Sequence, residues 1–590
     1  MREPFYGFLS NRVTTALVSP LGILEWLPWP RFDSDAAFCR LLDPRHGGFF
    51  STLPRGRIVE AHQHYRDGTL ILETSVRSAA GHANWIDFLP LGRDIFVRRL
   101  HSAIPLQLVC RPTFVFGSRR ASVVPRQNGA LFYSPEGREG LVLEIAGAAR
   151  PSPELDVWEI GPGVVDVVIR YAEDRAGDRA VPLGSVDAME AATTRYWQEQ
   201  RVSYDGPWSE WFNQSMRVIR ALTYRNNGAL VAAATTSLPE IIGEERQWDY
   251  RYVWVRDGAY GAEALLLAGD TASCRQFLEF IFNVTDLVDK PYPSPFVRVD
   301  GTLAHGEREL RWMAGHRGSR PVRVGNAASR QLQLDVEGEI LWVVWRYWRM
   351  TGDRSFVRDY WGAIQSVAEW ILAGWHQADA SLWEFRGFTD EFVHSRVLCW
   401  VGLAAAERLA EEVLNRPDLA MRWQQGRLQV ERSVWELKEA SGLGRFPQSR
   451  RSSQTDAALL TLPLYGFVDV NHPTFQRTLE AIETELVHDG LVFRYRQDNL
   501  GPALHPFTLA GFWLARVYLL RGDLARAEAI FARQLEVATD LKLFAEHVDV
   551  QSGEPRGNFP QLFPHVGLVT TLSDRRRLVA GDRLLEPLVR

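Results

Sequence analysis

A repeated junction between apolar helical runs is the feature that most constrains the fold of this 590-residue chain. A Gly-Asp pair follows an apolar run at Gly269–Asp270, Gly352–Asp353 and Gly522–Asp523. Glycine readily adopts the left-handed conformation that ends a helix, and aspartate is a favoured N-cap of the next one. We therefore expect antiparallel helical hairpins, arranged as a closed ring or as an open solenoid. The irregular period and the long aromatic loops favour the ring.

The first third of the chain has the pattern of β-strands instead. Apolar and polar residues alternate over residues 70–76 and 106–110, and valine is frequent from residue 164 to residue 171. Many short strands without helices between them predict a β-sandwich. A stretch rich in glutamate, alanine and glutamine follows and ends near Pro207. The sequence thus predicts a sandwich domain over residues 1–184, a helical linker over 185–207 and a helical domain over 208–590.

One aromatic and charged stretch, residues 246–257, is unlike an ordinary loop or a core strand. It holds three arginines, two aspartates, two tryptophans and two tyrosines. Aromatic faces cover the apolar side of a sugar ring, and arginine and carboxylate groups bind its hydroxyls. The alternative is a structural cluster of ion pairs between a loop and the start of a helix. A second such segment, residues 26–34, either staples the sandwich to its neighbour or reaches over the same site.

Two glutamates lie in settings that differ from a helix surface. Glu384 stands between Trp383 and Phe385. An apolar setting raises the pKa of a carboxyl group, which suits a general acid. Glu546 lies in a more polar segment, where we expect it to stay ionised and activate water. Two carboxylates with separated pKa values are the equipment of glycoside hydrolysis, although each one alone is more simply explained as a glutamate at the end of a helix.

Several long motifs occur in one order along the chain. Together they resemble glycoside hydrolase family 15, the glucoamylase-like family of prokaryotic type, over almost the whole length. The motifs are residues 16–34, 232–240, 248–257, 318–326, 382–387, 490–495 and 557–561. The resemblance implies a β-sandwich, a helical linker and an (α/α)6 barrel. It also implies inverting, exo-acting hydrolysis of α-glucosides from the non-reducing end.

The resemblance also assigns roles to individual residues. Glu384 is similar to the general acid of the family and Glu546 to its general base. The substrate-binding residues implied in the same way are Trp254, Arg256, Asp257, Trp383 and Arg494. This chemistry requires neither a metal ion nor an organic cofactor.

The substrate is less narrowly implied, because Leu504-His505 stands where Glu-Gly is common in the family. Our first hypothesis is a glucoamylase-like enzyme that releases β-glucose from short α-glucans or oligosaccharides. The alternative within the family is a trehalase. A further alternative is a carbohydrate-binding homologue without activity, against which the presence of both Glu384 and Glu546 argues.

Composition excludes other classes of partner. The net charge is −5, with 67 basic and 72 acidic residues, which gives no electrostatic basis for binding nucleic acid. No apolar run of about 18 residues or signal-peptide core occurs, so we expect no membrane partner and a cytoplasmic location. The four cysteines are widely spaced and are expected to be buried free thiols. The expected partner is an α-linked gluco-oligosaccharide or disaccharide substrate, and a homodimer is left open.

Overall fold

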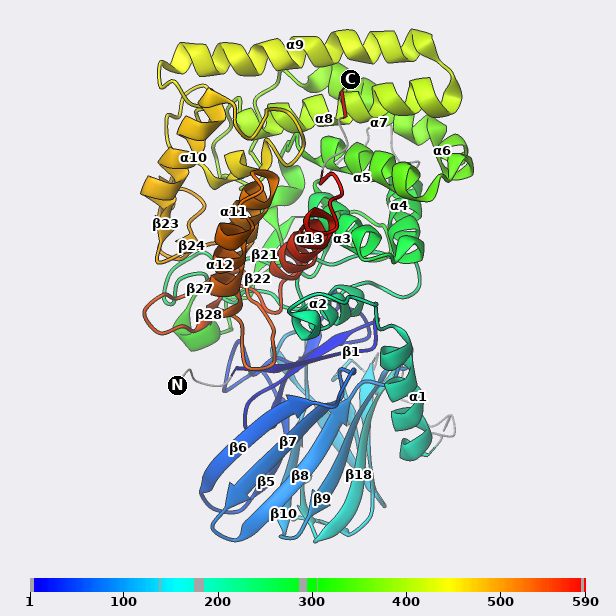
Figure 1. Ribbon diagram of the computed structural model, residues 1–590. Helices are drawn as coiled ribbons and strands as arrows, with labels where there is room; N and C mark the ends of the chain where they lie inside the picture. Colours follow the sequence, from blue (N-terminus) through cyan, green and yellow to red (C-terminus); the bar gives the residue numbers. More distant parts are fainter. Residues whose placement is uncertain are drawn as a thin grey trace.

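The computed structural model describes residues 5–136, 139–173, 185–285, 294–304, 306–584 and 588–589. Strands from the first part of the chain lie below a larger helical body in Figure 1. Helix α1 (Val186–Glu199) runs along the side of the strands, and α2 (Ser209–Ala221) lies where the two parts meet. The predicted sandwich boundary at residue 184 lies outside the described residues.

The strands form two antiparallel sheets that pack face to face. Phe50 of one sheet meets Phe96 of the other with ring centroids 5.7 Å apart. The order in the first sheet is β1 (Gly7–Ser10), β2 (Thr15–Val18), β3 (Leu24–Pro28), β5 (Phe49–Pro54), β10 (Leu106–Arg111), β17 (Val157–Ile160) and β16 (Ala149–Pro151), with β4 (Ala36–Phe38) beside β3. The order in the second is β13 (Ser122–Arg126), β14 (Gly129–Tyr133), β15 (Gly140–Ala146), β18 (Gly163–Ala172), β9 (Ile95–Ser102), β8 (Gly81–Phe88), β7 (Leu72–Ser78) and β6 (Ile58–Tyr65).

Alternating burial along these strands follows from the pleat, which turns successive side chains to opposite faces. In β7 every second residue, beginning with Leu72, is buried, and the strands predicted over residues 106–110 and 164–171 are present as β10 and β18. The β-sandwich is therefore confirmed.

The helical part is a closed ring of inner segments. Within the described residues these are α3 (Val255–Leu267), α5 (Val336–Thr351), α8 (Val393–Leu409), the 3-10 segment Ala457–Thr461, α11 (Thr508–Leu520) and α13 (Leu562–Val579). Each packs against the next, and α13 packs back against α3. All residues of α3 are buried. Most of them are apolar, and its charged residues Arg256, Asp257 and Glu263 lie within 4 Å of oppositely charged side chains.

Outer helices alternate with the inner segments along the chain. They are α2, α4 (Thr271–Thr285), α6 (Arg354–Asp359) with α7 (Trp361–Gly374), α9 (Pro417–Ser441), α10 (Pro473–Leu486) and α12 (Leu524–Leu535). These helices are amphipathic: α10 buries Phe475, Leu479, Ile482 and Leu486, which recur every three or four residues along one face. The alternation is that of the predicted (α/α)6 barrel, with a 3-10 segment in place of one inner helix.

The Gly-Asp junctions take the predicted conformations. Gly269, Gly352 and Gly522 have φ values of 90°, 69° and 76°. Asp353 caps α6 by accepting from Phe356 N at 3.0 Å, and the equivalent aspartates open α4 and α12. These junctions connect an inner helix to the next outer helix.

Buried hydrogen bonds join the two domains, and they are made by residues 26–34 of the sandwich with Arg251 and Ala234 of the barrel. Arg251 donates to the backbone oxygen of Ser34 at 2.5 Å, and Trp26 Nε1 donates to the oxygen of Ala234 at 2.9 Å. The segment 26–34 therefore staples the sandwich to the barrel. Arg251 is held in turn by a buried two-pronged ion pair with Asp249, so the structural hypothesis for part of the 246–257 stretch is correct.

Short elements complete the fold. They are β11 (Thr113–Phe114), β12 (Arg119–Arg120), β19 (Val253–Trp254), β20 (Phe296–Val297), β21 (Glu307–Glu309), β22 (Arg323–Gly325), β23 (Val487–His488), β24 (Leu491–Val492), β25 (Gln497–Asp498), β26 (Gly501–Pro502), β27 (His547–Val548) and β28 (Pro555–Arg556), with 3-10 turns at His316–Gly318 and Ala327–Arg330 and a π-helical turn at Ala410–Leu414.

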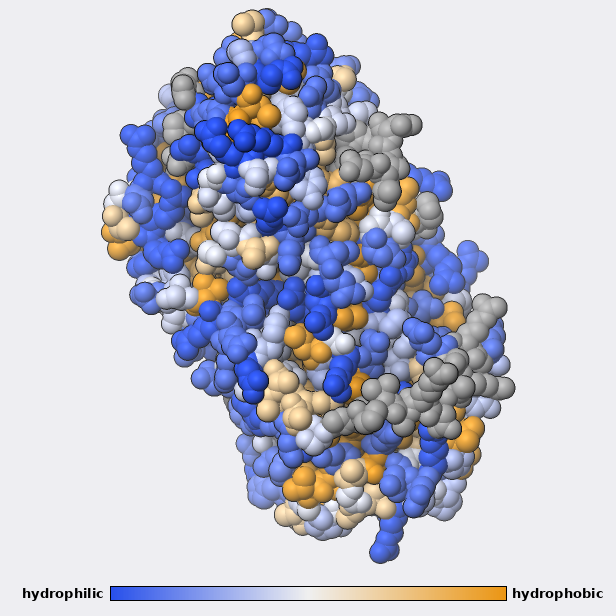
Figure 2. Space-filling view, turned by 90° about the vertical axis from the view of Figure 1, so that its right-hand side faces the viewer, coloured by the Kyte–Doolittle hydropathy of each residue, from blue (hydrophilic) through white to orange (hydrophobic). Residues whose placement is uncertain are grey.

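The apolar residues face the interior. All four cysteines are buried and free, as predicted. Figure 2 shows a largely hydrophilic face on which hydrophobic residues occur in small groups, as is normal for a globular protein. Within the described part of the chain, none of the helices has the length and apolarity that a membrane span requires.

We predict that Asp249→Ala lowers the free energy of unfolding by about 3–5 kcal/mol, because it leaves the buried guanidinium of Arg251 without its counter-charge. Urea denaturation measures this loss. Asp418→Ala is the matched control, since Asp418 forms an ion pair of the same spacing with Arg416 at the exposed start of α9. A loss as small in Asp249→Ala as in the control would show that the domain junction does not depend on the pair.

Candidate active site

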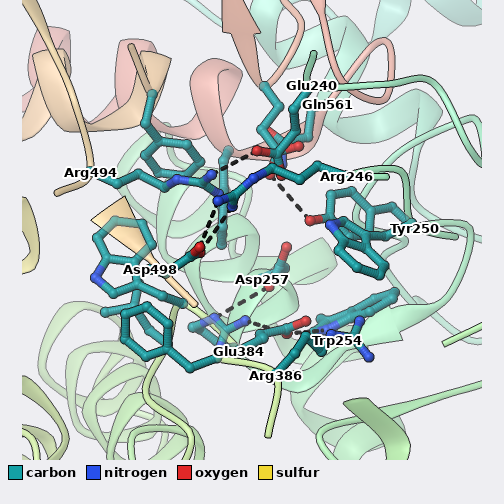
Figure 3. A pocket seen from close by; sticks show the side chains of 18 of the residues that line it. Glu240, Arg246, Tyr250, Trp254, Asp257, Glu384, Arg386, Arg494, Asp498 and Gln561 are labelled. Carbon is teal, nitrogen blue, oxygen red and sulfur yellow. Dashed lines mark hydrogen bonds and ion pairs between the residues drawn. The ribbon is translucent and has the colours of Figure 1, made fainter. Parts of the chain in front are cut away.

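A single pocket gathers the chemistry-bearing residues at one end of the barrel (Figure 3). The space between its walls, part of which is open to solvent, is about 700 Å³. Its lining residues are Glu240, Arg246, Trp248, Tyr250, Trp254, Arg256, Asp257, Leu382, Trp383, Glu384, Phe385, Arg386, Arg494, Tyr495, Asp498, Leu500, Phe507, Glu546, Gln561 and Phe563. Most of them come from loops, and the others lie in the first turns of α3 and α13, which explains why residues more than 300 positions apart meet here.

The floor of the pocket is the first turn of α3, which carries Arg256 and Asp257. The Arg256 guanidinium donates to Gln333 Oε1 at 2.9 Å and to Asp335 Oδ2 at 3.3 Å. Its Nε lies 3.6 Å from Asp257 Oδ2, which is too far for a hydrogen bond. Both atoms are buried without a partner among the described residues. Such atoms are rare in native proteins, and these two face each other. Both residues also line the pocket, where the hydroxyl groups of a ligand can approach them.

Burial also affects the charge of Asp257. Desolvation, which outweighs the nearby Arg256 guanidinium, raises the pKa of Asp257 to about 7. The helix begins at Val255, with Trp254 as its N-cap residue. Asp257 is therefore not an N-cap, and its side chain belongs to the pocket.

Glu384 lies above this floor, in the loop between α7 and α8. Its Oε1 accepts hydrogen bonds from Trp254 Nε1 at 2.6 Å and from Arg256 Nη2 at 3.0 Å. The aromatic neighbours predicted for Glu384 are present, but its setting is not apolar throughout, because a guanidinium and an indole N–H donate to the carboxylate. The φ of Glu384 is 57°, a conformation that costs a non-glycine residue energy and is typical of functional sites.

The second glutamate, Glu546, lies in a buried cluster with Glu240. Tyr250 donates its hydroxyl to Glu546 Oε1 at 3.2 Å. Arg494 forms an ion pair with Glu240 at 2.7 Å. The guanidinium of Arg494 is therefore paired with Glu240 and not with Glu546. Desolvation, followed by the negative charge of Glu240, raises the pKa of Glu546 to about 8. Our prediction of a polar environment that keeps Glu546 ionised is therefore wrong: only 5% of this residue is exposed.

One neighbour, His547, adds a third acceptor to this cluster. Its Nδ1 is bonded to the backbone oxygen of Pro506 at 3.0 Å, and its Nε2 lies 3.7 Å from Glu240 and 3.8 Å from Glu546. One ligand atom from each of the three residues falls within 4.8 Å of the others, a spacing that a metal ion could use. The negative charge of Glu240 is, however, already balanced by its ion pair with Arg494, so charge balance at Glu240 does not require a metal ion.

The seven residues that the sequence predicted for the site all line this pocket: Trp254, Arg256, Asp257, Trp383, Glu384, Arg494 and Glu546. Trp254 stacks on Phe296 with centroids 4.4 Å apart, and Trp383 donates to Asp456 at 2.9 Å. The sequence did not identify Glu240, Tyr250, Arg246 or Asp498 as site residues. The first three lie inside or beside motifs that the resemblance rests on, which was an available signal, whereas nothing local marks Asp498.

Comparisons with known proteins agree along the whole chain. The pattern of glycosyl hydrolases family 15 matches residues 211–573, and that of the trehalase-like N-terminal domain matches residues 5–148. Trehalase 1 of Sulfolobus acidocaldarius is 37% identical, over 97% of this chain and 98% of its own length. The trehalase of Mycobacterium tuberculosis is 31% identical, over 97% and 90%.

Among solved structures, a bacterial glucoamylase in complex with acarbose shares the fold. It superposes with a TM-score of 0.75 and covers 99% of this chain and 96% of its own, at 14% identity.

The position of Glu546 depends on Gly557, and a substitution there tests this. A Cβ at Gly557 would lie 2.9 Å from Glu546 Oε2 and 3.0 Å from its Cβ, at a backbone φ of 77°. We predict that Gly557→Ala lowers the melting temperature and displaces the Glu546 side chain in a crystal structure of the variant.

The matched control is Gly352→Ala, because Gly352 has a similar φ of 69° and nothing within 4 Å of an added Cβ. It carries only the conformational cost of about 1–2 kcal/mol. Equal losses in the two variants, with Glu546 unmoved, would contradict the prediction.

Proposed function

This chain belongs to glycosyl hydrolases family 15, and we propose that it is a trehalase, which hydrolyses α,α-trehalose to two glucose molecules with inversion. The observation that carries the proposal is the similarity to trehalases along nearly the whole chain, at 37% and 31% identity. The trehalase-like pattern of residues 5–148 supports it as well. These findings favour the trehalase alternative over the hydrolysis of short α-glucans that we expected first from the sequence.

Glu384 is the proposed general acid. Both described hydrogen bonds of its carboxyl group go to Oε1, which leaves Oε2 to carry a proton. This proton passes to the oxygen between the two sugars as the bond from that oxygen to the attacked C1 breaks. The departing glucose leaves with its own configuration unchanged.

Glu546 is the proposed general base. In its ionised form it accepts a proton from a water molecule whose oxygen attacks C1 from the opposite face. The hydroxyl of Tyr250 donates to Oε1 of this carboxylate and fixes its orientation. The proton gained by Glu546 and the proton lost by Glu384 balance, and exchange with solvent restores both groups.

The floor of the pocket is the proposed site of the glucose that is attacked. Arg256 and Asp257, which line the floor, bind its hydroxyls, and Trp254 and Trp383 flank its ring. Such contacts to non-reacting groups position C1 against both glutamates, so they contribute to turnover as well as to affinity.

We predict that the enzyme releases glucose from trehalose much faster than from maltose or isomaltose. The first products should be α-glucose and β-glucose in equal amounts, because inversion changes one of the two units. Proton NMR of the anomeric signals, recorded before mutarotation, measures this ratio. Two α-glucose molecules would show retention, and a preference for maltose would restore the α-glucan hypothesis.

We predict a pH profile that depends on Glu240. The base must be ionised, so kcat/KM of wild type should rise with pH through the raised pKa of Glu546. Glu240→Gln removes the negative charge that raises this pKa, and the rise should move to lower pH by roughly one unit. Glu245→Gln, the same change at an exposed position of the following loop, should leave the profile unchanged. A uniform loss of activity at every pH in Glu240→Gln would indicate a purely structural role.

A further inference from the structure

The pocket has a clear depth order, from a buried floor to an exposed mouth. Arg256 and Asp257 are 3% and 4% exposed at the floor, while Glu384 is half-buried. Leu500, which is 43% exposed, is the most exposed residue among the described lining residues. If the attacked sugar occupies the floor, its partner lies between Glu384 and Leu500.

Leu500 belongs to a very small hairpin. Strands β25 and β26 are two residues each and are joined by a turn of two residues, Asn499 and Leu500. A hairpin of this size has no stability of its own in water. Its position at the mouth must therefore be set by contacts with the rest of the protein.

An ion pair provides the first of these contacts. Arg246 donates through both terminal nitrogens to the two oxygens of Asp498, at 2.9 and 2.6 Å, and also to the backbone oxygen of Gly501 at 3.0 Å. Tyr495 adds a hydrogen bond to Asp498 at 2.7 Å. The two charged side chains are 6% and 7% exposed. A two-pronged pair of this kind fixes orientation as well as distance, and Figure 3 shows it across the pocket from Glu384.

A second contact ties the tip of the hairpin to the opposite side of the mouth. Asn499 Nδ2 donates to the backbone oxygen of Arg386 at 2.5 Å. Arg386 lies two residues after Glu384, and its guanidinium stacks over the ring of Trp248 at 4.2 Å. The hairpin is thus attached both to the loop of Arg246 and to the loop of Glu384, as a fixed wall and not as a hinged lid.

We propose that this hairpin limits the substrate to two sugar units, and that the Arg246–Asp498 ion pair holds it in the position that does so. The inference rests on the proposed function, because it concerns what can extend beyond the second glucose of trehalose. It makes residues 497–502 a determinant of specificity: the site rejects longer substrates by steric exclusion and not by weaker contacts.

The test compares trehalose with a trisaccharide in which one glucose of trehalose carries a further α-1,4-linked glucose. Hydrolysis of the 1,1 bond, with the unsubstituted glucose at the floor, places the extra unit at the hairpin and releases maltose. Wild type should release maltose from this trisaccharide at a small fraction of its kcat/KM for trehalose. Leu500→Gly and Asp498→Asn should raise that fraction by about tenfold or more.

A second variant and a matched control support the test. Leu500→Gly removes the side chain at the turn of the hairpin and leaves the Arg246–Asp498 ion pair intact. This variant therefore still tests the proposal if Asp498→Asn severely lowers the melting temperature. The matched control is Asp489→Asn, at the turn between β23 and β24, where an 88% exposed aspartate pairs with Arg533 away from the pocket. It should leave both rates unchanged.

The outcomes separate the two proposals. Equal hydrolysis of trehalose and the trisaccharide by wild type, or an unchanged fraction in Leu500→Gly, would overturn the exclusion by the hairpin. A loss of trehalose hydrolysis in both variants, with no gain for the trisaccharide, would also overturn it and assign the hairpin to binding the second sugar. A wild-type enzyme that fails to cleave trehalose would instead overturn the proposed function.

Discussion

The hydrogen bonds and ion pairs of one buried guanidinium, that of Arg256 at the floor of the pocket, are the interactions on which the rest of the site depends. Arg256 brings together α3, the segment before α5 and the loop before α8, through Gln333, Asp335 and Glu384. A buried charge of this kind is tolerated only when it is paired and hydrogen-bonded. The position of Glu384 is consequently coupled to the packing of the ring, and the left-handed backbone of this residue can be maintained because its side chain is held.

Glu384 and Glu546 have different electrostatic surroundings. Glu384 accepts donors from a cation and an indole, whereas Glu546 is buried against a second carboxylate whose own cation is Arg494. This arrangement gives Glu546 a high affinity for protons in the free enzyme. A base of that strength accepts a proton from water more readily than an ordinary carboxylate does, but it is ionised over a narrower range of pH.

The sequence predicted much of this structure because several signals are local. Gly-Asp junctions, alternating strands and the aromatic motif each act over a few residues, and the resemblance placed seven side chains in one pocket. What could not be predicted arises from contacts over long separations. Asp498 has no unusual neighbours, and its importance follows from Arg246, which lies 252 residues earlier. Similarly, the polarity of the segment around Glu546 predicted a carboxylate that stays ionised. Glu240, contributed by a distant loop, and the packed barrel instead place Glu546 in a buried cluster that raises its pKa.

The closure of the ring has a consequence for how the molecule is made. Helix α3 is buried on every side, and one of those sides is covered by α13, the last helix in the described part of the chain. During synthesis the sandwich and the early helices leave the ribosome well before α13 exists, so the apolar surface that α13 later covers stays open until α13 itself has been synthesised. Contacts between segments far apart in the sequence form late, and apolar surfaces left open in the meantime favour association with other chains. The same geometry that builds a deep pocket thus makes closure of the barrel dependent on α13, and a message truncated before α13 would yield a barrel that cannot close.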